Sequence, residues 1–222
     1  MPTLSSLNLK DYRMLVYKLP LTDIITTNAY FYIDEKSLHG FLIDPGAQAD
    51  KVIKIIQNNH WIIEKILLTH GHFDHIGAVQ YLSSELRIPY FIHQNGLQYL
   101  TNPELNLSTL FSSPISLFEA SYLNDNDVVP LNAAHSFSLR VIHCPGHTQD
   151  SVIYYDIQNS VAFSGDVIFQ EGYGRTDLPG GNQQLLLQNI KYKILTLPSH
   201  TILYPGHGLS TTVEEQKKLY RF

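Results

Sequence analysis

The residues most able to do chemistry in this chain gather in one short segment, His70-Gly71-His72-Phe73-Asp74-His75. Three imidazoles and one carboxylate lie within six consecutive positions. Imidazole nitrogens and carboxylate oxygens are the donors that zinc accepts in proteins. The apolar run 65–68 precedes the segment, and 76–78 follows it. We expect a buried strand that ends in a loop of metal ligands and leads into a helix, because a strand end holds ligands in a fixed geometry.

Three later segments share this arrangement, an apolar strand that ends in a potential ligand within a glycine-containing turn. They are 141–148, 162–166 and 203–208, and the potential ligands are His147, Asp166 and His207. Glycine permits a tight turn and a close approach of the backbone to a bound ion. Five histidines and two aspartates at four strand ends are enough to supply two metal ions. Each residue taken alone is better explained by a structural role, so the joint pattern carries the hypothesis.

The other histidines fit no position of this pattern, and a structural role is expected for each: His39, His60, His93, His135, His143 and His200. His143 is the least certain of them because it lies four residues before His147. Cys144 is expected to be a small buried residue rather than a thiol near the metals. Asp44 is expected either to orient a ligand near the His70 loop or to form a simple turn before Pro45.

Hydrophobic patterns predict the elements that position these residues. Strands are expected at 14–17, 28–33, 38–43, 61–69, 90–92, 137–142, 152–157, 160–163 and 202–204, and helices at 50–58, 78–86, 182–195 and 211–220. Residues 101–127 have no clear period and are expected to form short helix and loop. Runs of strands covered by helices occur twice, which favours two packed sheets with helices outside. The fold class is α/β (α+β), in a single domain over residues 1–222.

Composition excludes several classes of function. The chain has 222 residues, is 44% hydrophobic and 16% charged, and carries a net charge of −5, which gives no electrostatic footprint for nucleic acid or an anionic membrane. Its single cysteine excludes an intrachain disulfide and favours a reducing compartment. Residues 1–6 do not resemble a signal peptide, and no apolar run approaches the roughly 20 residues of a membrane span. We expect a cytoplasmic protein with no nucleic-acid or membrane partner; the oligomeric state stays open.

Taken in this order, the four segments resemble the metallo-β-lactamase fold family, close to its glyoxalase II-like (hydroxyacylglutathione hydrolase-like) branch. The resemblance runs from Asn28 and the segment 43–46 to the segment 205–207. It implies a four-layer αβ/βα sandwich with the site at the edge of the paired sheets. It also implies the distribution of the ligands: His70, His72 and His147 on one metal, Asp74, His75 and His207 on the other, and Asp166 between them.

The resemblance implies a metal-dependent hydrolase with a small-molecule substrate, a thioester such as S-acylglutathione. Two zinc ions are expected, with iron or manganese as alternatives. Two adjacent cations lower the pKa of a shared water and give a bridging hydroxide nucleophile, and one can polarise the substrate carbonyl. Asp74 and Asp166 are therefore expected to be catalytic as well as ligands. The alternative is a persulfide dioxygenase with one iron, held by the equivalents of His70, His147 and Asp166.

The segment 171–181 resembles the Gly-Arg-Thr-Asp segment of small glyoxalase II-like proteins and persulfide dioxygenases. It implies that Tyr173 and Arg175 line the substrate mouth, although Arg175 could instead pair with an acid and fix the loop. Only residues 208–222 follow His207, fewer than the helical region with which full-length glyoxalase II helps to hold glutathione. The chain also reads Gln149-Asp150-Ser151 where many relatives have Pro-Gly-Ser. Both departures leave the substrate open.

Overall fold

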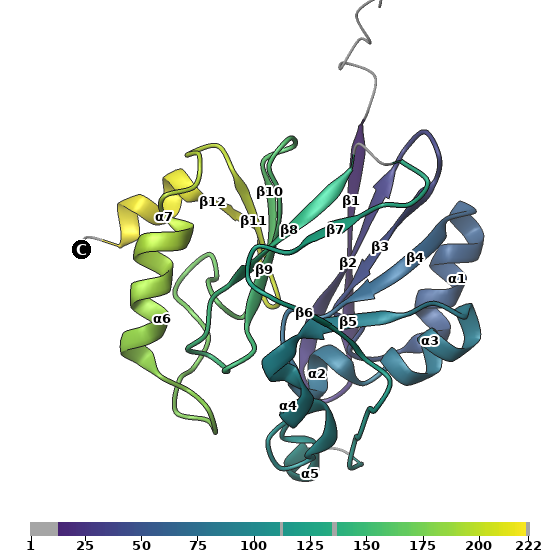
Figure 1. Ribbon diagram of the computed structural model, residues 1–222, viewed down its shortest axis with the longest axis horizontal. Coiled ribbons are helices and arrows are strands. Elements are labelled where there is room, and N and C mark those ends of the chain that lie inside the picture. The colour runs from purple at the N-terminus through teal and green to yellow at the C-terminus, as the bar shows by residue number, and fades with distance from the viewer. Residues whose placement is uncertain (1–12, 112, 135–136, 221–222) are drawn as a thin grey trace, which may run out of the picture.

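Two six-stranded sheets pack against each other, with helices on the two outer faces (Figure 1). The computed structural model describes residues 13–111, 113–134 and 137–220, so the expectations for residues 1–6 and for His135 lie outside the described residues. Helices α1 and α3 cover one sheet, and α6 and α7 cover the other. This arrangement confirms the predicted four-layer αβ/βα sandwich.

The first sheet has the strand order β1-β2-β3-β4-β5-β6. Its strands are β1 (Met14–Thr22), β2 (Thr26–Asp34), β3 (His39–Ile43), β4 (Ile62–Leu67), β5 (Tyr90–His93) and β6 (Ser121–Leu123). The pairs from β3 to β6 are parallel. Parallel neighbours need a crossover, and α1 (Ala49–Asn59) and α3 (Val79–Leu86) provide the first two. The ends of β3 and β4 therefore lie at one edge of the sheet, where β4 leads toward α2 (Phe73–Ile76).

The second sheet has the strand order β12-β11-β10-β9-β8-β7. Its strands are β7 (Val128–Pro130), β8 (Ser138–His143), β9 (Val152–Asp156), β10 (Val161–Gly165), β11 (Ile202–Pro205) and β12 (Thr211–Thr212). Only β10 and β11 pair in parallel among these strands. The crossover between them contains α6 (Gln183–Asn189), which continues into η2 (Ile190–Ile194), and α7 (Val213–Leu219) follows β12.

Three apolar layers hold the sandwich together. Along β2, Phe31 and Ile33 pack toward α1 and α3, whereas Tyr30 and Tyr32 pack between the sheets. Successive side chains of a strand point to opposite faces, so a strand buried on both faces is apolar along its whole length. The third layer lies between the second sheet and α6, where Leu186 is fully buried. Burial on both faces makes the strands rigid supports for the loops at their ends.

The segment 101–127 contains the expected short helix and also a strand, β6, that its sequence does not predict. Leu97–Thr101 forms α4 and Ser108–Phe111 forms α5. Strand β6 was missed because its three residues gain their conformation only by pairing with β5. The terminal helix also begins later than expected, since Thr211 and Thr212 pair with β11 and Thr212 with Glu215 forms a capping box at the start of α7. None of the helices in the described part of the chain is long and apolar enough to cross a bilayer.

Candidate metal centre

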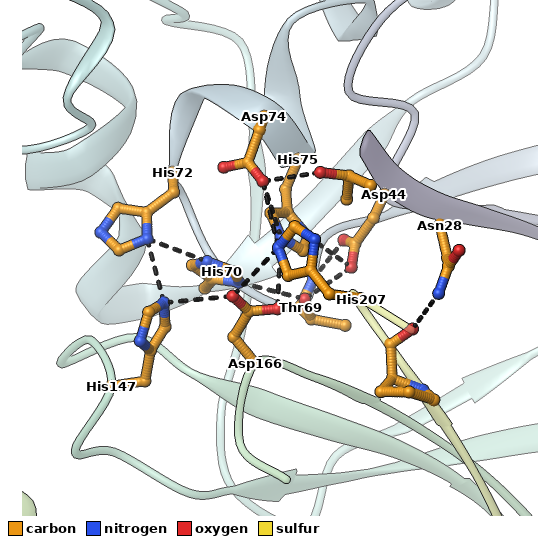
Figure 2. A network of polar contacts seen from close by, with 12 residues as sticks. Asn28, Asp44, Thr69, His70, His72, Asp74, His75, His147, Asp166 and His207 are labelled. Carbon is orange, nitrogen blue, oxygen red and sulfur yellow. Dashed lines mark hydrogen bonds and ion pairs between the residues drawn. The ribbon is translucent and has the colours of Figure 1, made fainter. Parts of the chain in front are cut away.

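Strand ends from both sheets bring the seven predicted ligands together (Figure 2). His70 and His72 follow β4, and Asp74 and His75 lie in the short helix α2 rather than in a loop as expected. His147 follows β8, Asp166 directly follows β10, and His207 follows β11. The cluster therefore depends on the packing of the two sheets, because neither sheet carries all of its members.

Three of the histidines form the first group. His70 Nε2 lies 3.1 Å from His72 Nδ1, and His147 Nε2 lies 3.0 Å from the same atom. Each of the three side chains is almost fully buried. Their ligand atoms lie within 4.8 Å of one another, a spacing at which a single ion can be shared.

Asp74, His75 and His207 form the second group. Asp74 Oδ2 lies 3.6 Å from His75 Nε2 and 3.3 Å from His207 Nε2. Asp166 faces both groups, because its Oδ1 lies 3.5 Å from His75 Nε2 while its Oδ2 lies 3.6 Å from His147 Nε2. The structure thus assembles the two expected sets around one shared carboxylate.

Hydrogen bonds on the outer side of three rings determine which nitrogen faces the cluster. The Nδ1 atom of His147 donates to the Arg175 carbonyl at 2.7 Å, and that of His207 donates to the Thr26 carbonyl at 2.9 Å. His75 Nδ1 lies 3.0 Å from Asp44 Oδ2. An Nδ1–H that donates outward leaves Nε2 with a free lone pair. These Nε2 atoms are therefore available as ligands.

Two supporting residues emerge beside the cluster. Asp44 accepts hydrogen bonds from Thr69 N at 2.8 Å and from the Thr69 hydroxyl at 2.6 Å, so the structure shows the orienting role rather than a simple turn. The Thr27 hydroxyl donates to Asp74 Oδ2 at 2.6 Å. Sequence reasoning missed Thr27, since it lies 47 residues from Asp74 and no local motif links the two.

Burial and charge divide the cluster electrostatically. Burial, reinforced by the neighbouring imidazoles, holds the pKa of His70 well below its usual value and lowers that of His72 to about 3. Burial opposes ionisation of Asp74, but attraction to His75 outweighs it and lowers the pKa of Asp74 to about 2. Burial lowers the pKa of His207 less than Asp166 raises it, and the result is about 10. The first group is therefore neutral, and the second contains charged partners.

Two buried atoms within the cluster fit the presence of cations. Among the described residues, His75 Nε2 and Asp166 Oδ1 are buried there without a hydrogen-bond partner. Such atoms are rare in folded proteins unless an ion or water satisfies them. Gly206 keeps the space open, because a Cβ there would lie 2.3 Å from Asp166 Oδ1. A mixed set of imidazole and carboxylate donors suits zinc, iron or manganese.

A cavity of about 360 Å³ opens above the cluster. Asp74, Asp166, Arg175 and His207 lie among its lining residues. The Arg175 guanidinium donates two hydrogen bonds to the Asp177 carboxylate, at 2.8 and 2.7 Å. Arg175 therefore pairs with an acid, which is the alternative role considered for it above. Tyr173 is not among the lining residues, and its hydroxyl accepts a hydrogen bond from Gln183. Its contact with substrate stays a prediction.

The other histidines that the structure describes lie outside the metal groups. His39 pairs with Glu64 at 2.9 Å. His93 and His143 stack with their ring centroids 3.8 Å apart. Cys144 is fully buried, and burial raises the pKa of its thiol to about 12, which suits a packing role.

Comparison with curated proteins gives relatives that match most of the chain. The chain is 40% identical over 190 residues to the probable metallo-hydrolase YqgX of Bacillus subtilis (strain 168), which covers 85% of this chain and 88% of that protein. It is 30% identical over 203 residues to the hydroxyacylglutathione hydrolase GloC of Haemophilus influenzae, covering 90% and 93%.

Solved structures show the same architecture. BLEG-1 B3 metallo-beta-lactamase matches with a TM-score of 0.85 and 38% identity, covering 92% of this chain and 97% of that one. TTHA1623, in a di-iron-bound form, matches with a TM-score of 0.82 and 32% identity, covering 93% and 100%. A model of the metallo-beta-lactamase superfamily matches residues 23–207. With its ligand groups at the edge of two packed sheets, the chain belongs to the metallo-beta-lactamase superfamily.

Proposed function

We propose that this protein is a metal-dependent hydrolase of thioesters of the S-acylglutathione type, working with two metal ions. The observation that carries the proposal is the pair of ligand groups that share Asp166 at the floor of an open cavity. His70, His72 and His147 would hold one ion; Asp74, His75 and His207 would hold the other. When bound, such ions acidify a water molecule and polarise a carbonyl oxygen.

The chain itself positions the reacting groups. Thr27 and His207 both contact Asp74 Oδ2, which holds this carboxylate at the cavity floor. Asp74 is therefore placed to orient a water molecule toward a substrate carbonyl. Asp166 links the two ligand groups, because its Oδ2 lies 3.6 Å from His147 Nε2 in the first group and 3.3 Å from His207 Nε2 in the second. Fixed positions of this kind lower the entropic cost of reaction.

The cavity favours a good leaving group. Among the described lining residues, no lysine, tyrosine or cysteine is present, and the carboxylates are the proposed ligands Asp74 and Asp166. A departing amine or alkoxide would need a separate proton donor. A thiolate, whose conjugate acid has a pKa of about 8.5, leaves without a separate proton donor. The resemblance to a hydroxyacylglutathione hydrolase supports the same substrate class.

We propose zinc as the metal, with iron or manganese as alternatives. The di-iron form of TTHA1623 supports a pair of ions, and iron as a candidate. The competing function, a persulfide dioxygenase, would need a single iron. The second ligand group, Asp74, His75 and His207, is compatible with both functions, so metal analysis separates them.

The test combines metal analysis with activity. Metal-loaded protein should contain about two ions per chain and hydrolyse S-lactoylglutathione, and His72→Ala should abolish this activity. His39→Ala is the matched control, because His39 pairs with Glu64 outside the cluster. Hydrolysis that survives His72→Ala would contradict the proposal. So would a single iron with oxygen consumption on glutathione persulfide, or turnover of a β-lactam without turnover of thioesters.

A further inference from the structure

The cavity lining includes four apolar residues, Ile25, Phe73, Leu107 and Phe111, which we call the apolar wall. Ile25 comes from the turn between β1 and β2, and Phe73 begins α2. Leu107 and Phe111 come from the segment around α5, which lies near α2 in Figure 1. Residues from distant parts of the chain thus build one surface beside the metal ligands.

Two stacked rings form the centre of the apolar wall. Phe73 and Phe111 lie with their ring centroids 5.4 Å apart and their planes 21° from parallel. Phe73 is 3% exposed and precedes the proposed ligand Asp74, whereas Phe111 is 42% exposed. The apolar surface therefore begins beside the metal ligands and continues to the mouth of the cavity. Stacked rings present a rigid surface at little entropic cost.

Leu107 reaches the cavity through an unfavourable backbone conformation. Its φ is 67°, in the left-handed region that residues other than glycine rarely adopt. Asn106 holds the segment in place, since its side-chain amide donates to the carbonyls of Tyr99 and Ile115 and its own carbonyl accepts from Phe73 N. Backbone strain that the surrounding structure maintains is concentrated at functional sites.

Apart from the proposed metal ligands, the cavity lining offers little to a polar or anionic substituent. Arg175 is the one lysine or arginine among the described lining residues, and Asp177 already binds its guanidinium. Leu178 and Phe169 are further apolar residues of the lining. Ile24 and Leu110, next in sequence to Ile25 and Phe111, are 53% and 68% exposed, so apolar surface extends beyond the mouth.

We propose that the apolar wall binds the acyl group of the substrate and selects unbranched apolar acyl chains of several carbons over short polar ones such as lactoyl. This inference rests on the proposed thioester hydrolysis and names its substrate class. Burial of one methylene changes binding by about fourfold. The cavity volume of about 360 Å³ is within the range of small-molecule sites.

The test varies the acyl group and keeps the thiol constant. We expect kcat/KM to rise from S-acetylglutathione through S-butanoylglutathione to S-hexanoylglutathione, by on the order of 100-fold across the series. Phe111→Ala should lower the hexanoyl-to-acetyl ratio about tenfold. The matched control is Phe118→Ala, because Phe118 is 72% exposed and does not line the cavity. This variant should have the same hexanoyl-to-acetyl ratio of kcat/KM as the wild type.

A second variant and a second measurement separate the possible failures. Leu107→Gly removes the side chain, and glycine adopts the same φ without strain, so it should also lower the ratio. S-hexylglutathione and S-methylglutathione are thioethers and contain no thioester to hydrolyse. Their affinities, measured by calorimetry, therefore report on binding to the apolar wall without turnover. Thioester hydrolysis with a flat acyl series, or a ratio unchanged in both variants, would overturn this inference and leave the proposed function standing. The opposite result is also informative. If the protein binds S-hexylglutathione more tightly than S-methylglutathione, if Phe111→Ala and Leu107→Gly both abolish this difference, and if no thioester is hydrolysed, the apolar wall is supported and the proposed function is overturned.

Discussion

The Nδ1 atom of His75 donates a hydrogen bond to Asp44 Oδ2 at 3.0 Å, so a carboxylate outside the cluster orients one of its rings. The same oxygen accepts the Thr69 hydroxyl, and that hydroxyl lies 3.2 Å from His70 Nδ1. His70 belongs to the first ligand group and His75 to the second. One buried carboxylate therefore connects both groups.

Asp44→Asn should lower the affinity for both metal ions by about 10-fold to 100-fold, because residues that orient ligands contribute on this scale. Asparagine tolerates the left-handed backbone at this position, where φ is 50°. The measurement is competition with a chelator of known affinity. Asp156→Asn is the control, since Asp156 is also buried but binds the Tyr32 hydroxyl, away from the cluster. The Asp156→Asn control should lose stability and keep its metal affinity. Equal metal affinities in the wild type, Asp44→Asn and Asp156→Asn would contradict the role of Asp44 in orienting both ligand groups.

Thr27→Val should lower the affinity of the second ligand group (Asp74, His75 and His207) for its ion. The affinity of the first group (His70, His72 and His147) should change less. Valine keeps the shape of threonine but cannot donate to Asp74 Oδ2. Stepwise metal titration should show one site weakened and the other nearly unchanged. Thr201→Val is the matched control, because the Thr201 hydroxyl is buried and has no partner among the described residues. Removal of the Thr201 hydroxyl should leave metal binding unchanged, and the variant should be at least as stable as the wild type.

Removal of the metals should lower the melting temperature by about 10 °C. A ligand present at 1,000 times its dissociation constant stabilises a protein by about 4 kcal/mol, and a chain of this size melts about 2–4 °C lower for each kcal/mol lost. The buried, unpartnered atoms of His75 and Asp166 lose their stabilisation when the ions leave. Scanning calorimetry with and without chelator gives the shift. His72→Ala should show a smaller shift, and an equal one would argue against ligation by His72.

Stability should fall as the pH is lowered from about 6.5 to about 4, in part because of His93. Burial, together with the stacked ring of His143, lowers the pKa of His93 to about 4. Between these values the unfolded chain binds a proton at His93 and the folded chain does not, so stability rises with pH in this window. The contribution is on the order of 2 kcal/mol.

His93→Asn isolates this contribution. Asparagine can still accept from Asn95 N, as His93 Nδ1 does at 3.2 Å, but does not titrate. Urea unfolding at pH 7 and at pH 4.5 should show a smaller loss of stability in the variant than in the wild type. His200→Asn, at an exposed histidine, should behave as the wild type. Equal losses in His93→Asn and the wild type would contradict the role of His93.

Much of the candidate site could be predicted because its chemistry is local. His70, His72, Asp74 and His75 lie in one segment, and His147, Asp166 and His207 each follow an apolar strand and adjoin a glycine-containing turn. Strand ends and turns are set by nearby residues, so their pattern survives in the sequence. The apolar runs likewise predicted the layered fold, because strands buried on both faces are continuously apolar.

The sequence by itself therefore determined which side chains are available for metal binding and which strands carry them. Only the tertiary structure decided that Thr27 holds Asp74, that Asp44 reaches both ligand groups, and that Leu107 turns into the cavity. These relationships join residues far apart in the chain, or force a backbone conformation that leucine does not prefer. Local propensity cannot encode them, because their free energy comes from contacts that exist only after the two sheets have packed.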